Sequence, residues 1–332
     1  MGWSVVRATG LTHHMPARSF KGYTLVLPTG GDSAFLLDMQ GRIVHRWQLP
    51  GYRSHLGKLL SNGNLLAMAT LQSVQRPEWE VGDAPLPFDK RVRLIGANQM
   101  TLIEVDWNGD VVWQYDNGFI HHDFHPLENG NVLFPQFVEI PDDLAKRVRG
   151  GVRRPREKPQ SMISDDFIEI DRDGNEVART SPWKLLGPVG DPIGKLENCV
   201  EWTHTNSVDI TGDGHLLFSC RSNSRVGIID RGAGELTWKY GAPRTFHQPN
   251  ATSLPNGNVL IFDNGMNRLA EMSYSRLVEV KPGPGEIAWE YFGNPREQFF
   301  SGHISGAQRL PNANTLVCEG TSGRVVKTTP NG

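Results

Sequence analysis

The sequence predicts an all-β fold, a six-bladed β-propeller built from four-stranded antiparallel blades. Two observations carry this prediction. A tight-turn signal recurs five times along the chain beside short β-rich runs, and a second type of hairpin alternates with it. The 36 glycines and 22 prolines among 332 residues also suit a protein rich in turns. Two alternating hairpins make one four-stranded sheet per repeat, and such self-similarity is typical of propellers.

The first hairpin is clearest around Asn256-Gly257-Asn258. Pro255 presets φ before the turn, Asn-Gly supplies the positive φ that tight hairpins need, and the apolar run 259–262 reads as a strand. The same signal stands at two other places and in looser form at two more: 62–64, 129–131, 211–215 and 310–314.

The second hairpin has a strand, a glycine turn and a strand with two aromatic residues. Trp113 and Tyr115 follow Gly109 by four and six residues, and the pattern repeats after Gly234 and Gly285. Residues two apart on a strand share a face, so these aromatic pairs are expected to pack between neighbouring sheets.

Full repeats begin near five histidines, and residues 22–49 supply part of a sixth unit. We therefore expect one propeller domain over residues 1–332, closed by a strand at 3–7 that completes the last blade. Insertions are predicted at about 71–99, 138–165 and 181–202. The second carries a basic run, 144–158, which is typical of a solvated loop and less typical of a lid.

Composition limits the partners and the compartment. A formal net charge of -2 does not favour nucleic acid or an anionic membrane. No apolar run approaches the roughly 20 residues of a membrane-spanning helix, and the start resembles no signal peptide. The three cysteines, Cys199, Cys220 and Cys318, suit a reducing compartment. We predict a cytoplasmic protein that acts on a small anionic or aromatic substrate, and no oligomeric state is indicated.

A histidine precedes each turn of the first hairpin. Three stand nine residues before it and two stand seven before, a difference of one strand period. Any one of them is equally consistent with a buried group that pins a blade. Five at equivalent positions favour a functional cluster in the central channel: His55, His122, His204, His247 and His303.

Polar residues on the neighbouring strands add to this cluster. Asn206 lies two residues beyond His204 on the same strand face, and Arg221 ends the next strand. A guanidinium beside imidazoles favours binding of sulfate, phosphate or carboxylate, although a salt bridge at a blade edge is nearly as consistent. Asp263-Asn264-Gly265 is expected either to orient an imidazole or to form a turn.

Four segments carry a resemblance to a known family: HTNSVD at 204–209, SCRSNS at 219–224, the stretch 247–265, and YSRLVEV at 274–280. With them the chain resembles the bacterial arylsulfotransferases, six-bladed propeller enzymes that move a sulfuryl group between phenols. It looks like a short form that lacks the N-terminal β domain.

The resemblance implies a histidine-bound sulfuryl intermediate and no cofactor. His247 matches the nucleophile, and the sulfuryl oxygens would be held by His122, His204, Asn206 and Arg221. We assign His247, His204, Arg221 and His122 to catalysis, and we assign substrate binding to Asn206, His55, His303 and Asn223.

Two alternatives stay open. One is a lyase or hydrolase with a divalent metal, because three neutral imidazoles and an open position are a usual catalytic metal site. Its ligands would come from His55, His122, His204, His247 and His303, and the neighbouring His121 and His125 favour it. The other is a non-catalytic scaffold, against which the converging histidines argue.

Overall fold

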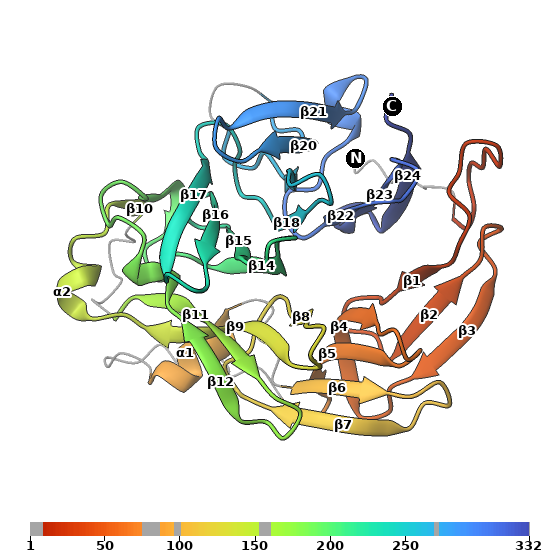
Figure 1. Cartoon of the computed structure of the whole chain (residues 1–332), viewed down its shortest axis with the longest axis horizontal. Helices are drawn as coiled ribbons and strands as arrows, with labels where there is room; N and C mark the ends of the chain where they lie inside the picture. The colour runs from red at the N-terminus through yellow and green to blue at the C-terminus, as the bar shows by residue number, and fades with distance from the viewer. Residues whose placement is uncertain (1–8, 75–86, 96–100, 153–160, 269–271, 332) are drawn as a thin grey trace, which may run out of the picture.

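The computed structural model describes residues 9–74, 87–95, 101–152, 161–268 and 272–331. Six small antiparallel sheets follow one another around a common centre, so the fold is the expected six-bladed β-propeller (Figure 1). Numbered in chain order, blades 2 to 5 have four strands each, and blades 1 and 6 have three strands within the described residues.

The blades are made of these strands. Blade 1 holds β1 (Thr24–Val26), β2 (Ser33–Leu37) and β3 (Ile43–Gln48). Blade 2 holds β4 (Tyr52–Leu59), β5 (Leu65–Leu71), β6 (Thr101–Val105) and β7 (Val111–Asp116). Blade 3 holds β8 (His125–Pro126), β9 (Val132–Glu139), β11 (Ile163–Ile170) and β12 (Glu176–Thr180).

The second half of the ring follows the same plan. Blade 4 holds β14 (Thr205–Ile210), β15 (Leu216–Cys220), β16 (Arg225–Asp230) and β17 (Glu235–Gly241). Blade 5 holds β18 (Asn250–Ser253), β19 (Val259–Asp263), β20 (Arg276–Lys281) and β21 (Glu286–Phe292). Blade 6 holds β22 (Gly306–Arg309), β23 (Thr315–Glu319) and β24 (Arg324–Thr328). The short helices η2 (Arg296–Gln298) and η3 (Gly320–Ser322) lie in the loops of the last two blades.

The Asn-Gly-Asn turns join the first two strands of their blades, as the sequence predicts. Gly257 has a φ of +80°, a left-handed conformation that glycine adopts without steric cost. The Asn256 side chain accepts a hydrogen bond from the backbone N–H of Asn258 at 3.0 Å. This local bond closes the turn and fixes the register of β18 and β19.

The same turns also tie each blade to the next. In blade 5, Glu279 accepts hydrogen bonds from Asn256 at 3.0 Å and Asn258 at 2.7 Å, and its other oxygen pairs with Arg309 of blade 6 at 2.8 Å. Trp289 lies 4.4 Å from the Arg309 guanidinium, ring centre to carbon. Blades 2 and 3 repeat the arrangement through ion pairs between Glu104 and Arg172 and between Glu169 and Arg231.

Apolar packing fills the spaces between blades. One cluster joins Trp238 and Tyr240 of blade 4 to Val259, Ile261 and Val278 of blade 5. The expected aromatic pairs therefore face a neighbouring sheet, and Trp238 stacks on Tyr240 with ring centroids 5.8 Å apart. Burial of these side chains between sheets holds the ring together.

The predicted closing strand at residues 3–7 lies outside the described residues. The segment just after it does contact the last blade, because the Asn314 side chain donates to the backbone oxygen of Arg18 at 2.7 Å. Lys327 likewise lies 3.4 Å from the backbone oxygen of Phe20. The two ends of the ring therefore meet (Figure 1).

The three expected insertions carry the elements that belong to no blade. They hold α1 (Phe88–Leu94), α2 (Asp142–Ala145), β10 (Gly150–Val152), η1 (Pro182–Lys184) and β13 (Ile193–Asn198). Strands β10 and β13 pair in parallel and form a small sheet beside blades 3 and 4. The basic residues at 153–158 lie outside the described residues. No helix in the described ranges is long and apolar enough to cross a membrane.

Candidate functional site

Three of the predicted histidines share an unusual backbone conformation. His122, His204 and His247 have φ values of 60°, 53° and 60°. These lie in the left-handed region, which residues other than glycine rarely adopt. Each lies just before its blade's first strand, or at the point where that strand begins. Strain of this kind costs on the order of 1–3 kcal/mol and is characteristic of functional sites.

Hydrogen bonds hold the strained backbone around His247. The N–H of His247 donates to the Ser224 hydroxyl at 3.1 Å, and the preceding N–H of Phe246 donates to Asp263 at 2.9 Å. Asp263 is itself paired with Arg268 and Arg276 at 2.7 and 2.9 Å. Asp263 also forms a turn, because it accepts a hydrogen bond from the N–H of Gly265 at 3.0 Å, and its contact with the histidine segment is to the backbone of Phe246.

His204 is held in the same way by a different set of groups. The next N–H, that of Thr205, donates to Asp165 at 2.7 Å, and the His204 carbonyl accepts from the N–H of Arg221 at 3.0 Å. The second contact places the start of the Arg221 loop directly against His204, which is the proximity that the sequence predicts.

The imidazoles of blades 3 and 4 are in direct contact. The rings of His122 and His204 pack edge to face with centroids 4.4 Å apart, and Nδ1 of His122 lies 2.9 Å from Nδ1 of His121. His55 lies on β4 at a bulge, where Nε2 is 3.5 Å from the Thr70 hydroxyl, and after burial and closer groups it is one of the smaller causes that lower the pKa of His122. Three blades therefore contribute imidazoles to one region.

Three imidazoles of the central group, those of His121, His204 and His247, also have a carboxylate partner. His121 Nε2 lies 3.0 Å from Asp165, and His247 Nε2 lies 3.0 Å from Glu197. His204 Nδ1 pairs with Glu201 three residues earlier in the chain. A carboxylate on one ring nitrogen fixes the tautomer and the orientation of the ring.

Burial controls the charges of this group. It lowers the pKa of His204 well below the usual range, and the nearby Arg221 lowers it further. Burial and the neighbouring His204 do the same to the pKa of His122. Burial raises the pKa of Glu201 to about 7. Burial opposes ionisation of Asp165 too, but His121 and the hydrogen bonds from Thr203 and Thr205 lower its pKa to about 2.

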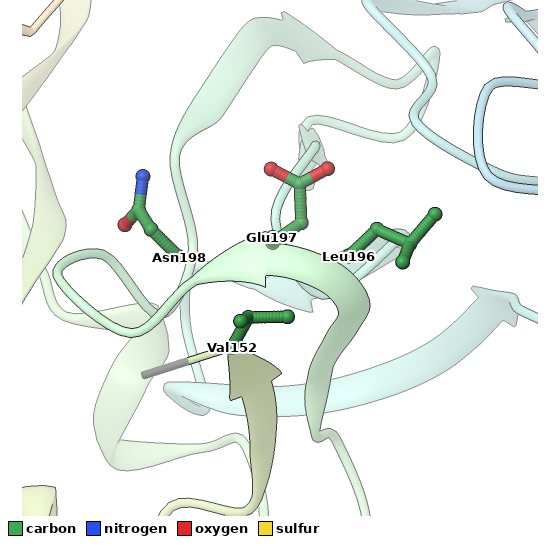
Figure 2. A pocket seen from close by; sticks show the side chains of 4 residues that line it. All are labelled: Val152, Leu196, Glu197 and Asn198. Atoms are coloured by element: carbon green, nitrogen blue, oxygen red, sulfur yellow. The ribbon is translucent and has the colours of Figure 1, made fainter. Parts of the chain in front are cut away.

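Arg221 and His247 lead to the open side of the site. Arg221 Nη2 lies 3.6 Å from Glu197, which also carries the bond to His247. Glu197 lines a pocket of about 330 Å³ together with Val152, Leu196 and Asn198. Figure 2 shows Leu196, Glu197 and Asn198 extending from one stretch of β13, with Val152 on the adjacent β10. Glu197 is therefore the residue that the pocket and the cluster share.

The two predicted amides lie on blade 4, Asn206 on β14 and Asn223 in the turn between β15 and β16. Asn206 lies at a bulge of β14 and its Nδ2 is 3.5 Å from the carbonyl of Gln248. Asn223 is only 2 % exposed, yet neither its oxygen nor its nitrogen has a hydrogen-bond partner among the described residues. His247 Nδ1 is also buried without a partner there. Buried polar atoms without a partner are costly, so each of these atoms is a candidate for contact with a polar ligand.

His303 differs from the other histidines. Its side chain is exposed, and its own backbone is not left-handed. In blade 6 the positive φ values belong to the next two residues, Ile304 at 51° and Ser305 at 101°. No contact between the His303 ring and the cluster is found among the residues described. The structure therefore gives no support to the expected place of His303 among the five converging histidines.

A metal centre also finds no support. Within residues 9–74, 87–95, 101–152, 161–268 and 272–331, no group of three His, Cys, Asp or Glu side chains could hold a metal ion. The ring nitrogens of His121, His204 and His247 face carboxylates. The three cysteines are free.

Sequence reasoning missed the carboxylates of the site. Glu201 stands three residues before His204 and could have been found by that spacing. Asp165 and Glu197 come from the ends of two insertions, and no local pattern connects them with the histidines. The proximity of Asp165 to the His204 segment is created by the packing of blades 3 and 4.

A family comparison agrees with this geometry. The family model described as "Arylsulfotransferase (ASST)" matches residues 82–254, just over half of the chain. The chain belongs to the arylsulfotransferase family. The matched range includes Arg221 and the three histidines whose backbone is left-handed, His122, His204 and His247.

Comparisons with solved structures define the fold alone. A protein of unknown function from Bacteroides caccae is 13% identical over 93% of this chain and 94% of that chain, with a TM-score of 0.54. The hydrazine synthase of Kuenenia stuttgartiensis is 10% identical over 99% of this chain and 81% of that chain, with a TM-score of 0.51. No curated protein matches the sequence.

Proposed function

We propose that the chain transfers a sulfuryl group from an aryl sulfate to a phenolic acceptor through a covalent intermediate on His247. The observation that carries the proposal is the meeting of His247 and Arg221 at one carboxylate, in a chain of the arylsulfotransferase family. The carboxylate marks a position where an anion contacts an imidazole and a guanidinium together.

The reaction has two balanced steps. In the first, a ring nitrogen of His247 attacks sulfur, an N–S bond forms, and the S–O bond to the donor breaks as a phenolate leaves. In the second, the oxygen of a deprotonated acceptor phenol attacks sulfur and the N–S bond breaks. The imidazole is regenerated, and no oxidation or reduction takes place.

The other groups of the cluster would stabilise the transferred group. Burial keeps His122 and His204 neutral, so each has an N–H for a sulfuryl oxygen and no charge repels Arg221. The guanidinium of Arg221 is then the positive charge of the site, as transfer of an anionic group requires. The unpartnered amide of Asn223 offers a further donor.

Mass spectrometry tests the intermediate. After incubation with an aryl sulfate and no acceptor, the wild-type protein should carry one added sulfuryl group on the peptide containing His247. His247→Ala should fold normally, carry no adduct and turn over no donor. Activity that is lost to chelators and restored by a divalent ion, with no adduct, would instead support the metal-dependent alternative.

A further inference from the structure

Glu197 stands where a substrate anion of the cluster would be expected. One of its oxygens lies 3.0 Å from Nε2 of His247, and the other lies 3.6 Å from Nη2 of Arg221. Both ends of the carboxylate are therefore engaged by the two groups that an oxyanion would use. The Glu197 side chain is 12% exposed, contacts His247 and lines the pocket.

The position of Glu197 in the chain suits a group that can be displaced. It comes from β13, in the insertion between blades 3 and 4, and so belongs to no blade sheet. The ladder of β10 and β13 pairs residues only at its two ends, Gly150 with Ile193 and Val152 with Asn198. Displacing the carboxylate therefore breaks no strand pairing, only its side-chain contacts, which include a 2.9 Å bond from Asn267.

We infer that Glu197 is an internal competitor for the anion site, a specificity-determining residue that must leave His247 and Arg221 before an oxyanion binds. Two negative groups cannot share the same guanidinium and imidazole donors without repulsion. Glu197 thus sets the affinity of the site for its anionic ligand. The inference rests on the proposed function only in taking a sulfate ester as the natural ligand.

Binding of inorganic sulfate at constant ionic strength tests this inference without turnover, with titration calorimetry as the measurement. Glu197→Gln keeps the shape of the side chain and removes its charge, and Glu197→Ala removes both. Each variant should bind sulfate on the order of tenfold or more tightly than the wild type. Adding Arg221→Ala to Glu197→Gln should abolish the gain, because the guanidinium is the group set free.

The matched control is Glu235→Gln, which removes one negative charge from an exposed position on β17. It should bind sulfate within about twofold of the wild type, because screening weakens distant surface charges. A gain of the same size in the control would overturn the inference, since net charge alone would then explain it.

The inference would also be overturned if both folded Glu197 variants bound sulfate no more tightly than the wild type. It would be overturned as well if neither the wild type nor any variant bound sulfate. Glu197 would then serve to position His247, and slower modification of that ring by an imidazole reagent in Glu197→Gln would identify that role.

Tighter sulfate binding without an adduct on His247 upholds the competition and rejects sulfuryl transfer. An adduct without tighter binding rejects the competition alone.

Discussion

The two ends of the propeller strands differ in the contacts of their buried polar side chains, although each end has buried polar atoms without a partner among the described residues, such as Nε of Arg309 at the turn end. At the end with the Asn-Gly-Asn turns, Glu279 is shared among Asn256, Asn258 and Arg309. At the histidine end, Asn223 and Nδ1 of His247 are buried without partners among the described residues. The turn end uses Glu279 to join two blades, and the unpartnered atoms of the histidine end belong to the site where we propose that an anion binds.

This difference also appears in the backbone. At the turn end, the left-handed positions are filled mainly by glycine, which adopts them without strain. At the other end, histidines occupy them in blades 3, 4 and 5. The comparison indicates that the turn end stabilises the fold. At the histidine end the strained backbone sets the position of each imidazole.

The largest expected effect is the loss of rate when the histidine end is altered. Arg221→Ala removes the positive charge beside His204 and His247, and His204→Ala removes one imidazole of the cluster. Each should lower kcat/KM for an aryl sulfate on the order of 10² or more, as for other preorganised groups that stabilise developing charge. Thermal unfolding should stay close to that of the wild type. A parallel loss of folding would show that these residues belong to the scaffold.

The next effect concerns stability at the turn end. Glu279→Ala leaves Arg309 and two asparagine amides without their acceptor, and should lower the free energy of unfolding by about 2–4 kcal/mol in denaturant titration. The control is Glu286→Ala, whose 3.6 Å pair with Lys281 is exposed and should contribute about 0.5 kcal/mol or less. Equal losses in the two variants would contradict the role given to the turn end.

The third effect is a dependence of stability on pH at the histidine end. Burial raises the pKa of Glu201 to about 7 in the folded protein, above its ordinary value of 4.5. Its stabilising contribution is complete below pH 4.5 and is lost as the pH rises through 7. His122 and His204 act in the opposite direction only below about pH 6.5, where the unfolded chain binds protons.

Between pH 6.5 and 8 the Glu201 contribution should therefore fall by about 1 kcal/mol. Denaturant titrations at several pH values measure it, and Glu201→Gln should flatten the slope in this window. A variant with the wild-type slope would show that Glu201 is ionised in the folded protein throughout the range.

The smallest expected effect compares strain at the two ends. Ala313 stands at φ 67° in the turn of blade 6, where the four other copies have glycine, and Ile304 stands at φ 51° at the other end of the same blade. Ala313→Gly and Ile304→Gly should each raise the free energy of unfolding by about 0.5–1 kcal/mol, because glycine relieves the left-handed strain. Neither change should alter the rate. Destabilisation by Ala313→Gly would mean that this turn carries no strain.

The sequence predicted the fold well because its evidence is local. The Asn-Gly-Asn turns and the aromatic pairs specify hairpins within about 20 residues, and their repetition specifies the ring. The site is harder, because contacts such as that of Asp165 with His121 join residues far apart in the chain. Spacing from a turn also does not reveal the backbone conformation, which is left-handed at His122, His204 and His247 but at Ile304 and Ser305 in blade 6.

The links at the turn end all run in one direction along the chain, with consequences for synthesis. Glu104 is made 68 residues before Arg172, and Glu169 is made 62 residues before Arg231. A blade that leaves the ribosome therefore keeps an unpaired acidic edge until its successor has emerged. The last junction needs the beginning of the chain, since Asn314 bonds to Arg18. The growing protein can add blades one after another, but the ring can close only after blade 6 has emerged.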